Sequence, residues 1–116
     1  MKSAQGETMT NDPNDAVDFI FKTAPEYAKA KAERVQLQEF RKSLKSLMMA
    51  KHLDKPLGAQ EREAYAADEY QQLLKGLAAA VEKEAALEWQ LEAAKMRVDI
   101  WKTREYNERK IEKLTM

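Results

Sequence analysis

The side chains that could carry out proton transfer or nucleophilic attack are few in this sequence. Histidine is the usual proton carrier near neutral pH, and the chain contains one, His52, beside Lys51 near the end of a predicted helix. There is no cysteine, and the serines lie outside any nucleophile-elbow sequence. A protonated imidazole stabilises a helix C-terminus, so a cationic or capping role for His52 is favoured over a catalytic one.

The acidic side chains offer one regular cluster. Glu84, Glu88 and Glu92 recur at every fourth residue, so they share one helix face and could bind a cation weakly. A solvated acidic face opposite a basic helix explains them better. A di-iron carboxylate bundle needs more than one histidine, and the three glycines form no phosphate-binding loop. The sequence therefore predicts no metal, no cofactor and no enzymatic activity.

Basic side chains are the second candidate chemistry, because they bind phosphates without reading a base sequence. Residues 26–53 carry seven basic and three acidic side chains, whereas residues 60–100 carry five basic and nine acidic ones. Pairing between these two segments explains the charges without a ligand, and contact with single-stranded DNA is the alternative. Near the C-terminus, basic residues alternate with aromatic ones, as they do in proteins that bind single-stranded nucleic acid. They also alternate with acidic residues three or four positions away, the spacing at which side chains pair on one helix. The candidate nucleic-acid contacts are Lys31, Arg34, Arg41, Lys42, Lys45, Lys102 and Arg104.

Composition indicates that long helices position these residues. The chain has 116 residues, of which 44% are hydrophobic and 34% charged, with three prolines and three glycines. It is rich in Ala, Glu, Lys, Leu and Gln, which favour helices. No apolar run is long enough to span a membrane, and the first residues do not resemble a secretory signal, so a cytoplasmic location without membrane contact is expected.

Proline and glycine divide the chain into elements. Pro25 suits the first turn of a helix, and Pro56 with Gly58 predicts a loop. Residues 60–67 either continue the last helix or form a separate turn. We expect a flexible tail over residues 1–12 and one helical domain over residues 13–116, with helices at about 14–23, 25–53 and 60–113.

Apolar residues that recur at alternating steps of three and four predict that the two long helices pack together. The expected seam of the first consists of Leu37, Phe40, Leu44 and Leu47, with Met48 beside it. The expected seam of the second consists of Leu73, Leu77, Ala80, Glu84, Leu87, Leu91, Ala94, Val98 and Trp101. With a short loop between them, the prediction is an all-α fold, a long antiparallel helical hairpin resembling a coiled coil.

The last helix is the longer, so its end is expected to overhang its partner by about 16 residues. The short N-terminal helix presents Val17, Ile20 and Phe21 on one face. A helix this short is stable only when it docks, and we expect it to pack on the overhanging end and cover Trp101.

Trp89 does not fit this seam, because it lies about 160 to 200° around the helix from Leu87 and Leu91. A second apolar strip on one helix indicates a surface for a protein partner or a second copy of the chain, and a homo-oligomer is expected. The alternative is a displaced packing that buries Trp89 inside the monomer. The candidate partner surface comprises Leu74, Val81, Trp89, Trp101 and Tyr106.

Two stretches carry a family resemblance. Residues 27–49 include Lys31-Ala-Glu-Arg-Val, and residues 60–105 include Gln60-Glu-Arg-Glu-Ala-Tyr and the segment from Arg97 to Trp101. Together they resemble a family of small, largely uncharacterised bacteriophage proteins. The resemblance brings no catalytic motif. It implies a phage protein encoded among early recombination and replication genes, acting inside the host cell.

These observations predict a non-enzymatic phage accessory protein of DNA recombination or replication. It is expected to bind a protein partner of phage or host, or single-stranded DNA. Two alternatives stay open: a self-associating structural coiled-coil scaffold, and a phage inhibitor of a host enzyme.

Overall fold

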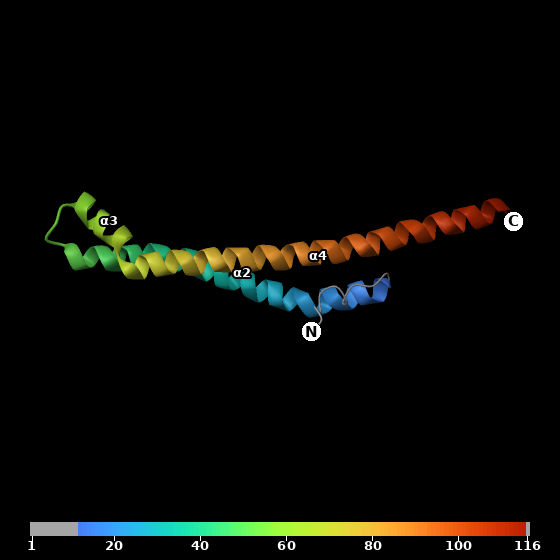
Figure 1. Ribbon diagram of the computed structural model, residues 1–116, viewed down its shortest axis with the longest axis horizontal. Helices are drawn as coiled ribbons and strands as arrows, with labels where there is room; N and C mark the ends of the chain where they lie inside the picture. The colour runs from blue at the N-terminus through green and yellow to red at the C-terminus, as the bar shows by residue number, and fades with distance from the viewer. Residues whose placement is uncertain (1–11, 116) are drawn as a thin grey trace, which may run out of the picture. The chain divides into compact units, whose positions relative to one another are not determined.

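The computed structural model describes residues 12–115, and every regular element among them is helical (Figure 1). Helix α2 spans Pro13–Met49 and ends in a short 3-10 helix, η1, over Ala50–His52. Helix α3 spans Leu57–Ala66, and α4 spans Asp68–Thr115. The all-α prediction is confirmed. The chain divides into two compact units, which are described in turn.

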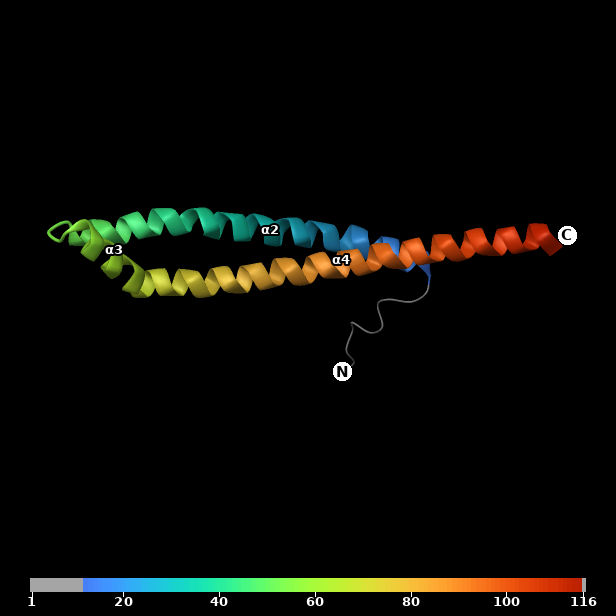
Figure 2. The same cartoon turned by 90° about the horizontal axis from the view of Figure 1, so that it is seen from above.

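The first unit, Ala28–Ala85, is an antiparallel helical hairpin and is called the loop-end unit below. Here α2 and α4 lie side by side and run in opposite directions, with η1 and α3 between their ends (Figure 2). The predicted hairpin is thus confirmed in this unit. Its core is formed by buried side chains from all three α-helices, namely Leu44, Met48, Ala64, Tyr70 and Leu73.

Helix α3 is a separate element, which settles the question of residues 60–67. Pro56, with an extended backbone, precedes its first turn, and Ala67, also extended, separates it from α4. Ala67 still donates a backbone hydrogen bond to Ala64 at 3.2 Å, and its own carbonyl accepts one from Gln71 at 3.0 Å. These two bonds satisfy backbone groups at the end of α3 and at the start of α4, so the chain can turn between the two helices within a single residue.

One buried ion pair interrupts the apolar seam of the loop-end unit. Arg34 donates to both carboxylate oxygens of Glu84, at 2.6 and 3.0 Å, and to Gln38 at 2.8 Å. Only 9% of the surface of Glu84 is exposed to solvent. A carboxylate is tolerated at such a position when a bidentate guanidinium accompanies it. The one polar residue in the predicted seam of α4 therefore has its partner on α2.

The second unit, residues 12–27 and 86–115, is called the terminal unit. The start of α2 lies beside the C-terminal part of α4, and α4 continues past it (Figures 1 and 2). Small side chains, Ala16, Thr23 and Ala94, are buried here together with Leu91, and small residues let two helix backbones approach closely. After Glu105 every described residue of α4 is exposed, so the predicted overhang is present.

The expected helix break at Pro25 is wrong. Helix α2 runs unbroken from Pro13 to Met49 with Pro25 inside it, so the short N-terminal helix is part of α2. The buried residues Ala16, Thr23, Ala30 and Leu44 are spaced by seven or fourteen residues, and thus keep one heptad phase on both sides of the proline. Pro25 itself is exposed, so its ring does not disturb this packing.

Two details of the predicted packing are also wrong. Phe40 and Leu47 are exposed, because the buried stripe of α2 passes through Leu44 and Met48 instead. Phe21 does not cover Trp101, since Phe21 keeps 78% of its area exposed. Both predictions relied on large apolar side chains, whereas smaller neighbouring side chains fill the space between the helices.

We expect Arg34→Met to lower the melting temperature by several degrees at neutral pH, because it leaves the Glu84 carboxylate buried without its guanidinium. The hydrogen bonds from Arg34 hold the pKa of Glu84 below its ordinary value of 4.5. Glu84 therefore stabilises the folded state above about pH 4.5, and this contribution is lost as the pH falls through the lower folded pKa.

Thermal melts followed by circular dichroism should show the gap between wild type and Arg34→Met narrowing in acid. Lys42→Met is the matched control, because the Lys42–Glu39 pair is exposed and 3.8 Å long. An unchanged gap at all pH values would contradict the assigned role of the pair.

We expect Pro25→Ala to stabilise the protein by about 1–3 kcal/mol, because proline inside a helix removes one hydrogen bond and its ring clashes with the preceding turn. Urea denaturation measures the change. Glu26→Ala, also exposed, is the control and should alter stability little. A loss of stability in Pro25→Ala would show that the proline favours the fold.

Candidate binding surface

The residues considered for catalysis are not brought together. His52 ends η1, and its carbonyl accepts a backbone hydrogen bond from Lys55 at 3.0 Å. Glu84 pairs with Arg34, whereas Glu92 bonds weakly to Lys95 at 3.4 Å. Among residues 12–115 no three potential metal ligands are grouped. The expected acidic face is present in part, since Glu84 does meet the basic helix, but as a buried pair.

Two of the candidate nucleic-acid contacts on α2 already have protein partners. Arg34 is bound to Glu84, and Lys45 donates to Glu61 at 3.0 Å. The Lys45 ammonium also lies 4.9 Å from the centre of the Tyr65 ring. The Tyr65 side chain, and then Glu61, hold the pKa of Lys45 above its ordinary value of 10.5. Both cations therefore contribute to packing of the loop-end unit.

The other bases on this helix are more available. Lys31 and Arg41 are exposed, and Lys42 makes a long pair with Glu39. A shallow pocket of about 290 Å³ lies over this part of α2. It is lined by Arg41, Lys42, Lys45, Tyr65 and Tyr70.

The two tyrosines of this pocket come from different helices and meet edge to face. Tyr65 of α3 and Tyr70 of α4 have ring centres 5.3 Å apart and planes at 71°. Sequence reasoning missed both of them, because the fold-back of α3 that places them beside α2 was left open. The Gln60–Tyr65 stretch followed by Asp68 contained the signal, a short helix and then a fresh cap.

The terminal unit presents an exposed apolar face on α4. We define the α4 stripe as the face carrying Trp89, Ala93, Met96, Ile100, Thr103, Asn107, Lys110 and Leu114, which follow steps of four and three residues. Trp89 is 69% exposed, and Met96 and Ile100 are each 51% exposed. Trp89 and Met96 each lie two residues from a buried seam residue, Leu91 and Ala94, and hence on a different face of the helix.

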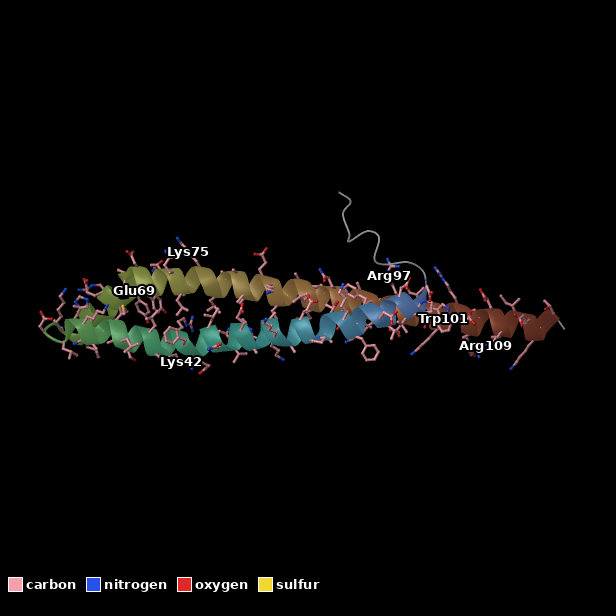
Figure 3. The ribbon with its side chains drawn as sticks, turned by 90° about the horizontal axis from the view of Figure 1, so that it is seen from below. Lys42, Glu69, Lys75, Arg97, Trp101 and Arg109 are labelled. Carbon is pink, nitrogen blue, oxygen red and sulfur yellow. The ribbon has the colours of Figure 1, made fainter. Side chains whose placement is uncertain are left out.

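A groove on α4 continues the stripe toward the seam. It has a volume of about 310 Å³ and is lined by Ala93, Met96, Arg97, Ile100, Trp101 and Arg104. Arg97 and Trp101 project from this segment, and Arg109 lies further along the same helix (Figure 3). Trp101 is 39% exposed and so stands at the edge of this surface. The combination of apolar side chains with two guanidinium groups is typical of a protein-binding surface.

The residues predicted for the partner surface differ in their exposure. Trp89 lies outside the monomer core, so the alternative that buried it is wrong. Tyr106 is exposed, with the Lys110 ammonium 5.9 Å from its ring centre. Leu74, however, packs against the core of the loop-end unit. Val81 is 45% exposed and belongs to the same unit as Leu74.

Met96 and Ile100 were missed by the sequence reasoning. Their spacing of seven and eleven residues from Trp89 was the available signal. Lys102 and Arg104 are exposed on the same helix, and Arg104 lines the groove.

The loop-end unit has an apolar groove of its own between α2 and α4. Leu37, Phe40, Leu44 and Leu73 line it, and Asp68, Glu69 and Gln72 add polar groups. Gly76 also lines it, and a side chain added there would meet nothing within 4 Å. This groove shares no residue with the α4 stripe.

Comparison with known proteins finds no match: no protein-family model, no curated protein and no solved structure resembles the chain significantly. Within residues 12–115, none of the helices combines the length and apolarity needed to cross a membrane. The residues themselves therefore carry the functional argument.

Exposure predicts opposite outcomes for two neighbouring substitutions. Trp89→Ala should change the free energy of unfolding by less than about 0.5 kcal/mol, because the ring is largely in water. Leu91→Ala should cost about 2–3 kcal/mol, because Leu91 is 9% exposed and packs in the seam. Urea denaturation at the lowest practical protein concentration measures both. A large loss in Trp89→Ala under these conditions would place the indole in the monomer core.

Proposed function

We propose that the chain is a non-enzymatic phage accessory protein of DNA recombination or replication that works by binding another polypeptide through the α4 stripe. The biological setting rests on the resemblance of residues 27–49 and 60–105 to small phage proteins. The mode of action rests on the exposed face of α4. Its most telling observation is Trp89, a large indole held in water on a rigid helix.

Large exposed apolar side chains in a row cost solubility and mark interaction surfaces when they are contiguous. Trp, Met and Arg are enriched in such surfaces, and all three occur here together. A preformed helix also loses little conformational entropy on binding, because its backbone is already ordered. These features favour a partner that presents apolar side chains.

Photo-crosslinking in cells tests this proposal. A benzophenone amino acid placed at Ala93 on the stripe should form adducts with polypeptide, whereas the same group at Lys95 should form few. Lys95 is the matched control, because it is exposed and lies two residues along, about 200° around the helix. Equal yields at both positions, or no polypeptide adduct at either, would refute binding through the stripe.

A second candidate function is contact with single-stranded DNA in the tyrosine pocket of the loop-end unit. Arg41 and Lys42 line this pocket and Tyr65 contributes a ring, a combination suited to phosphate binding and base stacking. The substitutions to test are Arg41→Glu and Lys42→Glu. Arg34 is unsuitable, because its loss removes the partner of buried Glu84.

If DNA binds there, fluorescence anisotropy of a labelled oligonucleotide should show salt-sensitive binding. The variant that combines both substitutions should bind the oligonucleotide about tenfold more weakly or worse. Lys22→Glu, an exposed base of the terminal unit, serves as the charge-matched control. Binding that persists in the double variant would exclude the pocket as the DNA site.

A further inference from the structure

We infer that the partner of the α4 stripe is a second copy of the same chain, bound in parallel and in register. This inference rests on the proposed function, since it names the occupant of the surface described there. It concerns residues 89–114, which lie within the terminal unit. The charges on the two sides of the stripe favour such a pairing.

The stripe follows a heptad pattern in which its residues take the a and d positions of a coiled coil. Ala93, Ile100, Asn107 and Leu114 occupy a, and Trp89, Met96, Thr103 and Lys110 occupy d. This pattern extends over 26 residues, or about 38 Å of helix. Its apolar members are exposed in the single chain, so they are available to pack against another helix.

The two flanks of the stripe carry opposite charges. On the side toward the seam, position e is occupied by Arg97 and Arg104. On the other side, position g is occupied by Glu92 and Asp99. Each acid thus precedes a base by five residues, which is the spacing of the g-to-e pairs between parallel helices.

A parallel, in-register pair of α4 helices brings these flanks together. Glu92 of each copy meets Arg97 of the other, and Asp99 meets Arg104, so four acid–base pairs form. The next pair in the series is Tyr106 with Ile111, both apolar and both exposed in the single chain. All three successive pairs are therefore complementary.

An antiparallel pair lacks this complementarity. There e faces e and g faces g, so Arg97 lies against Arg104 and like charges repel. An unrelated helix would have no reason to match the order of charges found on this chain. The sequence of the flanks therefore favours self-pairing in one orientation.

Asn107 adds a second argument for a defined register. An asparagine at an a position meets its own copy across a parallel two-stranded pair, where the two amides hydrogen-bond to each other. In other alignments it would face an apolar side chain and lose that bond. Its place in the projecting end of α4, where every described residue is exposed, leaves room for a second helix.

Charge reversal tests the pairing. Wild-type protein should associate reversibly in sedimentation velocity, and Arg104→Glu or Asp99→Lys alone should weaken association by roughly tenfold or more, because each places like charges opposite each other twice. An equal mixture of the two variants should regain association, since both pairs then become complementary. Arg109→Glu, a charge reversal at an outward position, is the control and should change little.

Cysteine crosslinking tests the orientation, and the chain has no native cysteine to interfere. Met96→Cys and Thr103→Cys should each form a disulfide-linked dimer in a glutathione redox buffer, whereas Lys95→Cys should not. Only a parallel, in-register pair brings both positions against their own copies, because an antiparallel two-fold axis passes near one position at most.

Three outcomes would overturn the inference: a monomer at all concentrations, single reversals that associate like wild type, or crosslinking at only one of the two stripe positions. The adducts from Ala93 separate this failure from failure of the proposed function. An adduct with a different polypeptide leaves the proposed function standing and refutes self-pairing. Absence of any stripe-specific adduct refutes both.

Discussion

Two helices packed against each other can each bury only a single stripe of side chains, and the core of each unit follows from that constraint. Among the described residues no large side chain is fully buried. The loop-end unit buries alanines, two leucines, Met48, Tyr70 and one ion pair, Arg34 with Glu84, whereas the terminal unit buries mainly alanine, threonine and Leu91. Small residues bring the backbones close, whereas the ion pair fixes how α2 and α4 align in the loop-end unit. Nothing in such a core can shelter a tryptophan on the far face.

The seam of α4 could be predicted from sequence because its pattern is unambiguous. Leu73, Leu91 and Ala94 are buried where the alternation of three and four residues placed them. Glu84, the one exception in that series, turned out to be compensated by Arg34 across the hairpin. Contrast between apolar and charged residues is strong along this helix, so the phase is well determined.

The buried face of α2 was harder to predict, because the large apolar residues of this helix are not the ones that are buried. Phe21, Phe40 and Leu47 attract attention but are exposed, whereas Ala16, Ala30 and Thr23 form the contact. Alanine gives little signal in a hydrophobic pattern, since it is common on every face of a helix. The helix break predicted at Pro25 was wrong for a related reason. The local preference of proline favours a break, but the heptad phase continues on both sides, and packing offsets the free-energy cost of a proline inside the helix.

The two candidate surfaces also differ in how much of each could be predicted from the sequence. The basic residues of α2 were visible in the sequence, yet their partners, Glu84, Glu61 and Tyr65, are distant in the chain and appear only when the hairpin closes. Of the α4 stripe only Trp89 was predicted from the sequence, although its other members follow from their spacing once the seam is located. The pocket of Tyr65 and Tyr70 had no such signal, because three helices assemble it.

Proline inside α2 also sets how the protein opens locally. The missing amide at Pro25 leaves the turn before it with one hydrogen bond fewer, close to where the terminal unit's part of α2 ends at Tyr27. The first turns of α2 can therefore fray as a small cooperative segment while the hydrogen bonds beyond the proline persist. Fraying there uncovers part of the buried face of α4, so the same helix would then offer solvent a second apolar face in addition to the stripe that carries Trp89.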